Sequence, residues 1–138
     1  MIGLDTNVLA RYYIEDKKDA ESQRQRAAAR RLIDSGKPLM VCKTVILELE
    51  CVMRGYYGFT HAEVNSVLRH LMGIPHISIE DRDTVERALS QCDAGLELAD
   101  ALHHASYRDG DSMVSFDDKK FARRARKLGL MPNVVVPK

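Results

Sequence analysis

Five short apolar segments, separated by longer stretches with helical patterning, constrain the fold of this chain most strongly. They are four to six residues long and, in chain order, are MIGL, KPLMVC, HISI, SMVSF and NVVV. Short strands that alternate with helices favour a parallel sheet, because each right-handed crossover returns the chain along one face of that sheet. The pattern therefore predicts a three-layer α/β fold, with a mostly parallel central sheet of about five short strands and helices on both faces.

The stretches between these segments carry signals for helix starts and ends. The chain from Ala20 to Gly36 is rich in Ala and Arg, which favour helices, and Gly36 is expected to end this helix. Thr60 is followed three residues later by Glu63, which is the spacing of a capping box. This pair predicts a helix that begins at Thr60 and ends near Gly73.

The composition is that of a nearly neutral globular chain. With 138 residues it is long enough to bury a core, so we expect a single domain over residues 1–138. The chain has 21 Lys and Arg residues against 20 Asp and Glu residues, a formal net charge of +1. Any nucleic-acid site must therefore come from local segregation of charge.

The cysteines and the apolar runs indicate the compartment. Cys42, Cys51 and Cys92 are odd in number and lack C-x-x-C spacing, which argues against a disulfide framework and against a zinc site. We expect reduced, buried thiols. No apolar run is long enough to span a membrane, and no secretory signal precedes the first strand. These features predict a cytoplasmic protein.

Acidic residues follow two of the apolar segments directly. Asp5 comes at the end of MIGL, where it is either the N-cap of the next helix or a metal ligand at the carboxyl end of a strand. Asp117 ends SMVSF in the same way, and its neighbour Asp118 is expected to cap the helix that follows. Ligands of parallel sheets bind outside the carboxyl ends of the strands, so other acids are expected near Asp5 if it is a ligand.

Two further acids lie in predicted helices. If the helix after the second strand buries Val45, Leu49, Val52 and Met53, Glu48 lies at the edge of the apolar face. Glu50 then forms an exposed ion pair with Arg54, its i+4 partner. Asp100 lies among Leu98, Ala99, Ala101 and Leu102, where a carboxylate is costly unless it is solvated, paired or metal-bound.

Histidines near Asp100 offer an alternative ligand set. Glu97, Asp100 and His104 are spaced as a helical stripe, and such stripes bind iron in helix bundles. The alternating strands argue against a bundle. We therefore expect His103 and His104 to be exposed or locally hydrogen-bonded.

Four carboxylates that converge require a counter-charge, because they cannot all stay ionised at close range. Mg²⁺ and Mn²⁺ prefer oxygen ligands, bind phosphates and activate water. Asp5, Glu48, Asp100 and Asp117 are therefore predicted to be catalytic and metal-binding residues for phosphodiester hydrolysis.

The order of four motifs resembles that of the PIN-domain ribonucleases, and among them the VapC-type toxins of bacterial toxin–antitoxin pairs. The motifs are DTN (5–7), VILELE (45–50), ELADAL (97–102) and SFDDKKF (115–121). The resemblance spans the whole chain and places the acids of the family on Asp5, Glu48, Asp100 and Asp117. It implies that Asn7 orients the first acid and that Ser115 is the small hydroxyl before the last, with Thr6 completing the DTN triplet. It also implies Mg²⁺- or Mn²⁺-dependent endonucleolytic cleavage of RNA, a homodimer, and inhibition by a small antitoxin protein.

Basic and aromatic residues are candidates for RNA contacts. Near the last acid these are Lys119, Lys120, Arg123 and Arg124, and an earlier helix adds Arg24, Arg26, Arg30 and Arg31. Each basic segment is equally consistent with a solvated helix face. Tyr12, Tyr13, Tyr56 and Tyr57 are candidates to stack on bases, or to pack or line a dimer interface.

Two other functions fit parts of the pattern. A receiver-type phosphoacceptor domain requires an aspartate at the end of its central strand, but the second strand here ends in Cys42 and Lys43. A non-catalytic RNA- or protein-binding module on the same fold remains the alternative. The sequence leaves open which RNA is cut and where, and whether one or two metals bind. It also leaves open the identity of the antitoxin, the dimer interface, and whether Asp117 or Asp118 is the last metal ligand.

Overall fold

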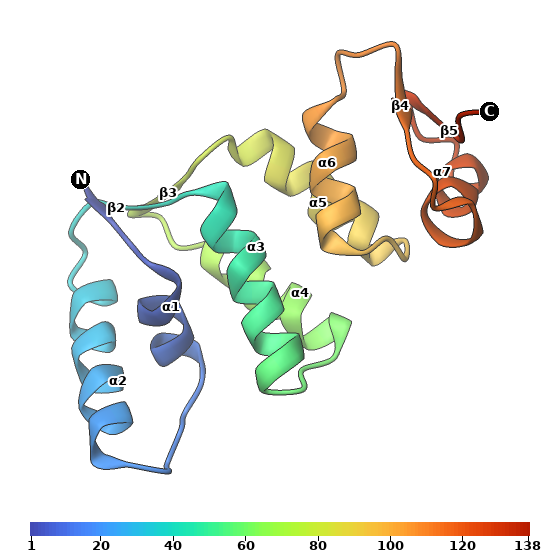
Figure 1. Ribbon diagram of the computed structural model, residues 1–138. Coiled ribbons are helices and arrows are strands. Elements are labelled where there is room, and N and C mark those ends of the chain that lie inside the picture. Colours follow the sequence, from blue (N-terminus) through green and yellow to red (C-terminus); the bar gives the residue numbers. More distant parts are fainter. The chain divides into compact units, whose positions relative to one another are not determined.

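The structure is a computed structural model that describes residues 1–138, and the chain divides into two compact units (Figure 1). The N-terminal unit is Met1–Glu80 and the C-terminal unit is Asp81–Lys138. Each unit has its own parallel sheet and its own buried side chains.

The N-terminal unit holds a three-stranded sheet and four α-helices. Its elements are β1 (Ile2–Gly3), α1 (Thr6–Tyr13), α2 (Ala20–Ile33), β2 (Leu39–Val41), α3 (Lys43–Cys51), a π-helical turn η1 (Val52–Tyr56), α4 (His61–Met72) and β3 (Ile77–Ile79). The strand order is β1-β2-β3 and both pairings are parallel. The central strand pairs on both sides, with Leu39 opposite Ile2 and Ile77.

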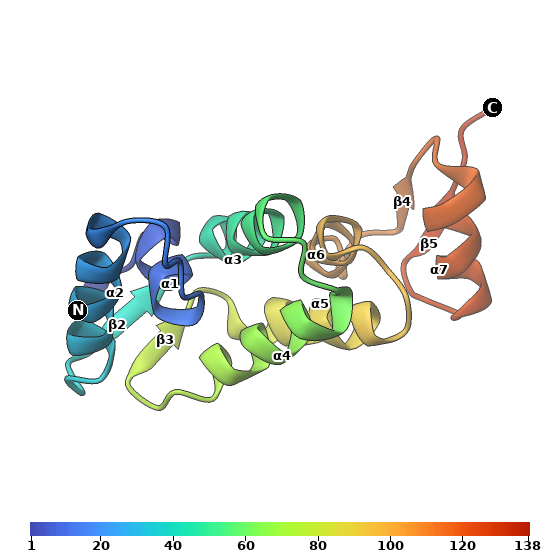
Figure 2. The same ribbon diagram turned by 90° about the horizontal axis from the view of Figure 1, so that it is seen from below.

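Helices of the N-terminal unit pack through aliphatic side chains. Helices α1 and α2 lie side by side in both views of the chain, and α1 also contacts α3 (Figures 1 and 2). The largest fully buried side chains of this unit are Leu9, Ile33, Leu39, Val41, Ile46, Leu49, Met53, Val64, Leu68, Leu71 and Ile77. This core packs α1 against α3. Asp5 directly precedes α1, and Glu48 lies in α3.

The C-terminal unit holds a two-stranded sheet and three α-helices. Its elements are α5 (Arg82–Asp93), α6 (Leu98–Ser106), β4 (Ser112–Val114), a π-helical turn η2 (Asp118–Ala122), α7 (Arg123–Lys127) and β5 (Asn133–Val135). Strands β4 and β5 are parallel, with Met113 opposite Val134. Helices α5 and α6 pack on each other and α7 packs on β5.

The predicted α/β class is confirmed, with seven α-helices and five strands, and all three strand pairings are parallel. The capping box is also confirmed, because Thr60 and Glu63 satisfy each other's backbone N–H groups at the start of α4. The strands are grouped as three in one sheet and two in another. The prediction of a single domain over residues 1–138 stays a prediction.

The predicted buried face of α3 is correct only in part, because Leu49 and Met53 are buried but Val45 and Val52 are half-buried. The structure buries Ile46, Leu49 and Glu50, and Met53 follows in η1, whereas Glu48 is exposed. The ion pair of Glu50 with Arg54 is present at 3.4 Å, but Glu50 is buried rather than exposed. The buried face is rotated toward Ile46 and Glu50 relative to the expectation, and Glu48 is exposed.

The cysteines and histidines also differ in part from the expectation. All three cysteines are free thiols, as predicted, but Cys51 is exposed and Cys42 and Cys92 are half-buried. Cys51 is exposed because it lies opposite the buried face of α3. His104 is buried and its Nε2 donates to the carbonyl of Pro132 at 2.9 Å, so its ring is held by the backbone. None of the helices has the length and apolar character needed to cross a membrane.

Candidate active site

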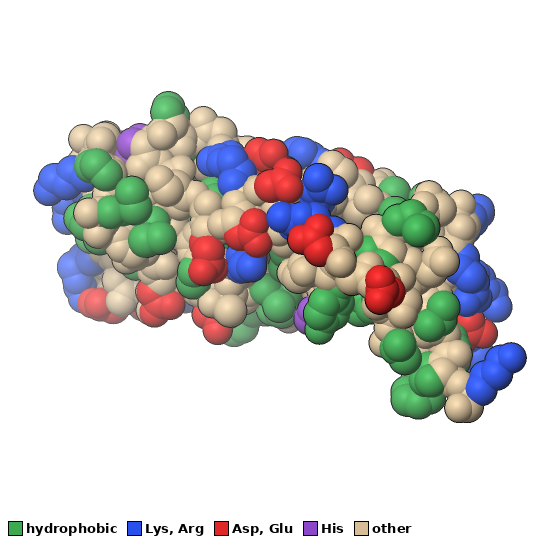
Figure 3. Space-filling model, turned by 90° about the horizontal axis from the view of Figure 1, so that it is seen from above, with side chains coloured by type: hydrophobic (Ala, Val, Ile, Leu, Met, Phe, Trp, Pro, Cys, Tyr) green, Lys and Arg blue, Asp and Glu red, His purple; other side chains and the backbone are tan.

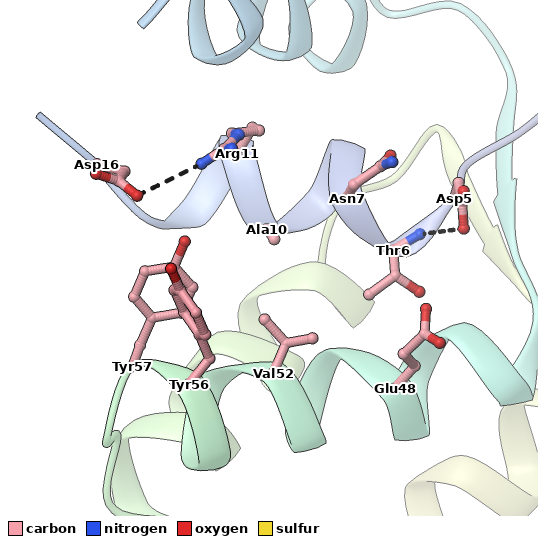
Figure 4. Close-up of a pocket in the computed structure, with 10 residues that line it drawn as sticks. All are labelled: Asp5, Thr6, Asn7, Ala10, Arg11, Asp16, Glu48, Val52, Tyr56 and Tyr57. Carbon is pink, nitrogen blue, oxygen red and sulfur yellow. Dashed lines mark hydrogen bonds and ion pairs between the residues drawn. The ribbon is translucent and has the colours of Figure 1, made fainter. Parts of the chain in front are cut away.

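Asp5 begins α1 and lies in a pocket. Its Oδ1 accepts a hydrogen bond of 2.8 Å from the backbone N–H of Thr6, so Asp5 is the N-cap that the sequence allowed. The same carboxylate lines a pocket of about 390 Å³ together with Glu48 of α3 (Figure 4). The cap and the pocket position are therefore compatible.

Thr6 supports this pocket from inside. Its side chain is buried, and its Oγ1 has no hydrogen-bond partner. Figure 4 shows the Thr6 side chain pointing from α1 toward the Glu48 carboxylate on α3. A buried hydroxyl without a partner costs free energy, so this oxygen marks a place where a polar ligand or water would be stabilised.

The pocket continues away from the acids between α1 and η1. Its other lining residues are Asn7, Ala10, Arg11, Asp16, Val52, Tyr56 and Tyr57. Arg11 and Asp16 form an ion pair of 3.9 Å at the far end, where the two tyrosine hydroxyls also point (Figure 4). The pocket is thus acidic at one end, apolar in the middle and aromatic at the other end.

Asp100 and Asp117 line a second pocket, in the C-terminal unit. It has a volume of about 270 Å³, and its charged lining residues are Glu97, Asp100, Asp117, Lys120 and Arg124. Burial of Asp100 raises the pKa of its carboxyl, and the nearby charges of Asp117 and Glu97 raise it further, while His103 opposes them. The two predicted acids therefore interact electrostatically.

The neighbouring acids Asp117 and Asp118 have different environments. Asp117 Oδ1 accepts the backbone N–H of Lys120 at 3.0 Å and so caps η2, which corrects the expectation that Asp118 is the cap. Asp118 instead pairs with Arg126 at 2.8 Å, and this pair lowers the pKa of its carboxyl. Ser115 Oγ accepts the backbone N–H of Asp117 at 3.1 Å, which fixes the turn that carries this acid.

The predicted RNA contacts near the last acid divide into two groups. Lys120 and Arg124 line the pocket of Asp100 and Asp117, and Arg124 donates to the carbonyl of Gly95 at 2.7 Å. Lys119 and Arg123 are exposed and outside that pocket. The positive charge closest to the acids is therefore carried by Lys120 and Arg124.

The residues present fit a hard divalent cation in their chemistry. Each pocket offers two predicted carboxylates, and the first adds the unpartnered Thr6 hydroxyl; all are oxygen donors. Within either unit, no group of three or more Asp, Glu, His or Cys side chains is close enough to hold a metal ion. The structure thus brings together Asp5 with Glu48 and Asp100 with Asp117, and a site formed by all four stays a prediction.

Arg11 and Asp16 are pocket residues that the sequence interpretation missed. Arg11 lies one helical turn after Asn7, and this i+4 spacing indicates that both face the same side of α1. Asp16 lies in the segment EDKKD, which has no periodicity from which its orientation follows.

The protein is therefore an α/β protein with parallel sheets and acidic pockets. In each pocket a carboxylate that follows a strand lies with a second carboxylate from a helix. The chain belongs to the PIN domain family: the family model of the PIN domain matches residues 2–127, which includes residues of both units. Members of this family are typically nucleases that use Mg²⁺. A comparison with curated proteins found none that matches the chain.

Proposed function

We propose that this PIN domain is a Mg²⁺- or Mn²⁺-dependent endoribonuclease that acts as the toxin of a toxin–antitoxin pair. Its proposed catalytic and metal-binding residues are Asp5, Glu48, Asp100 and Asp117. The observation that carries the proposal is the pairing of these acids, Asp5 with Glu48 in one pocket and Asp100 with Asp117 in another, within a PIN domain.

The chain's own groups hold the acids in place. The backbone N–H of Thr6 fixes the Asp5 carboxylate, and Ser115 fixes the backbone of Asp117. Each of these acids also begins a helical segment, which limits the orientations of its side chain. Asn7, next to Thr6 on α1, is proposed to support the first acid, as the resemblance implies.

The raised pKa of Asp100 supports a counter-charge in the proposed site. Burial of Asp100 disfavours its charged form, the nearby charge of Asp117 adds to that cost, and a bound cation would offset both. When bound, Mg²⁺ or Mn²⁺ supplies positive charge for the scissile phosphate and activates water for its hydrolysis. Lys120 and Arg124, which line the pocket of Asp100 and Asp117, are proposed to contact the phosphate backbone of the RNA.

The biological role rests on the resemblance to VapC-type toxins. It includes a homodimer and a small antitoxin protein that blocks the acids. An arginine of the antitoxin would suit this role, because a bidentate guanidinium replaces the positive charge of the metal.

Neutral isosteres of the four acids test the catalytic proposal. We expect Asp5→Asn, Glu48→Gln, Asp100→Asn and Asp117→Asn each to lower metal-dependent RNA cleavage at least about 10²-fold, the scale of losing one charge-stabilising group. The measurement is cleavage of labelled RNA with and without EDTA, alongside circular dichroism to show that the variants fold. Asp118→Asn is the matched control, because Asp118 pairs with Arg126 outside the pocket, and it should cleave like the parent.

Cleavage by Asp5→Asn at the parent rate would contradict the metal site. An RNA-binding module without catalysis would instead bind RNA equally well in all four variants and cleave it in none, the parent included. For the toxin role, expression of the parent should arrest growth and expression of the acid variants should not. Normal growth during strong expression of the parent would contradict that role.

A further inference from the structure

Three cavities of the N-terminal unit lie between Asp5 and Glu48 at one end and a group of cations at the other, and each shares lining residues with the next. Together they are called the groove. The cavity beside the acids shares Asp16, Tyr56 and Tyr57 with a second one. The second shares Glu15 and Lys17 with a third, whose further lining residues are Gln23, Ala27, Arg26 and Arg30.

The middle of the groove is aromatic and open to solvent. The side chain of Tyr56 is 69% exposed although it lies in the cavity wall, and its ring meets that of Tyr57 edge-on, with the ring centres 4.7 Å apart. The ammonium of Lys18 lies 5.8 Å from the centre of the Tyr56 ring, a cation–π distance. The cation lies over one face of an exposed aromatic ring, and such a ring is a platform on which a nucleobase stacks once the lysine turns toward the phosphate.

The far end of the groove is basic. Lys17, Arg26 and Arg30 line it against a single carboxylate, Glu15. The Nη1 atom of Arg26 is buried and has no hydrogen-bond partner. A buried charged donor without an acceptor is costly, and a phosphate oxygen at this position would satisfy it.

The acid in the middle of the groove does not oppose an anion. Asp16 pairs with Arg11 at 3.9 Å and accepts the backbone N–H of Lys18 at 3.0 Å. Its charge is therefore compensated inside the N-terminal unit, and the cations beyond it determine the local potential.

We propose that this groove binds the single strand of the RNA substrate, with an unpaired base stacked on Tyr56 and a phosphate held by Lys17, Arg26 and Arg30. The inference rests on the proposed ribonuclease function and deepens it, because it assigns the strand a path away from the acids. A base in a duplex is already stacked and paired, so it cannot lie on Tyr56. The groove therefore selects unpaired RNA.

Binding measured without cleavage tests the aromatic part. The protein carries Asp5→Asn so that the RNA stays intact, and the probe is a single-stranded RNA oligonucleotide with 2-aminopurine in place of one adenine. We expect binding to quench the probe, and Tyr56→Ala to abolish the quenching and weaken binding about 5- to 150-fold, the range for one stacked base. Tyr56→Phe should retain both effects. Tyr107→Ala is the matched control, since Tyr107 is also exposed but lines none of these cavities.

The basic part is tested by the salt dependence of the same binding. Arg26→Ala and Arg30→Ala should each weaken binding and reduce the slope of log K against log salt by about 1, because each lost phosphate contact releases one counterion fewer. Arg24→Ala is the control on the same helix, since Arg24 pairs with Glu21 and lies outside the groove. The same oligonucleotide annealed to its complement should bind more weakly than the single strand.

Unchanged affinity for the single strand in Tyr56→Ala and Arg26→Ala overturns the groove proposal while the parent still cleaves RNA, so the proposed function would stand. Equal affinity for the duplex overturns it as well. If these variants lose binding to a protein partner and not to RNA, the groove is a protein interface and the inference is wrong. If the parent protein does not cleave RNA in the cleavage assay described above, the proposed function is wrong. That assay is separate from the binding measurements.

Discussion

At the scale of single residues, the two candidate acids that follow strands each have two roles. Asp5 caps α1 and lines the first pocket, and Asp117 caps η2 and lines the second. The sequence raised the cap and the ligand as alternatives for Asp5, but one carboxylate has two oxygens and several lone pairs. An acceptor bond to one N–H therefore does not exclude a second role.

Asp100 provides a pH-dependent prediction. Its pKa is raised by burial and by Asp117, so between its unfolded value and the raised folded value the native state holds more protons than the unfolded state. The free energy of unfolding then falls as pH rises through that window and stays lowered above it. In EDTA at neutral pH, Asp100→Asn should stabilise the protein by roughly 0.5–1 kcal/mol, the low end of such gains because water screens this half-exposed group.

Urea unfolding of parent and variant at several pH values measures this effect. Asp118→Asn is the control, and it should lower the free energy of unfolding at neutral pH rather than raise it. Arg126 lowers the pKa of Asp118, so this carboxylate stabilises the folded state above its unfolded pKa, and that contribution is lost as pH falls through the folded value. Destabilisation by Asp100→Asn in EDTA would show that Asp100 is a structural hydrogen-bond acceptor.

At the scale of elements, the sequence predicted the order of strands and helices because alternation and caps are local properties. The face of α3 was not predictable in the same way. Val45, Ile46, Leu47 and Leu49 are all apolar, so helical spacing fits two faces about equally well, and tertiary packing selects the one with Ile46. The π-helical turns η1 and η2 were missed because their wider turn leaves no distinct residue pattern.

The capping box of α4 gives a prediction for one element. Thr60→Ala removes the acceptor for the backbone N–H of Glu63, so we expect a loss of about 1 kcal/mol in the free energy of unfolding. Ser66→Ala is the control, because Ser66 is exposed inside the same helix, where Ala is the better helix former. Chemical denaturation of both variants measures the difference, and equal stabilities would mean that the cap contributes nothing measurable.

At the scale of the whole molecule, the charge is nearly balanced, with 21 Lys and Arg residues against 20 Asp and Glu residues. On the face seen in Figure 3, acidic and basic side chains are interspersed, in keeping with the net charge of +1. The near-neutral composition predicts that any RNA binding depends on local clusters of positive charge. The composition did not reveal the cluster of Lys17, Arg26 and Arg30. Lys17 precedes α2 in a segment without periodicity, so only the folded chain shows that it lies near the two arginines of that helix.

The predicted single domain has a measurable consequence for unfolding. If residues 1–138 form one cooperative domain, far-ultraviolet circular dichroism and the near-ultraviolet signal of the tyrosines should report one coincident urea transition. Each compact unit, Met1–Glu80 or Asp81–Lys138, should then fail to fold when expressed alone. Two separate transitions, or a folded fragment, would show that the two units are independent domains.

The double role of Asp5 and Asp117 has a genetic consequence. If the chain acts as the proposed toxin, a cell can escape it by changing either residue, but most replacements also remove the acceptor that begins a helical segment. Asn and Ser keep an acceptor and remove the charge, so under the proposed function they would abolish RNA cleavage and preserve the fold. Inactive forms that persist as folded protein, and still occupy a partner, should therefore carry a narrow set of replacements at these two positions. Most other substitutions there should yield chains that are degraded.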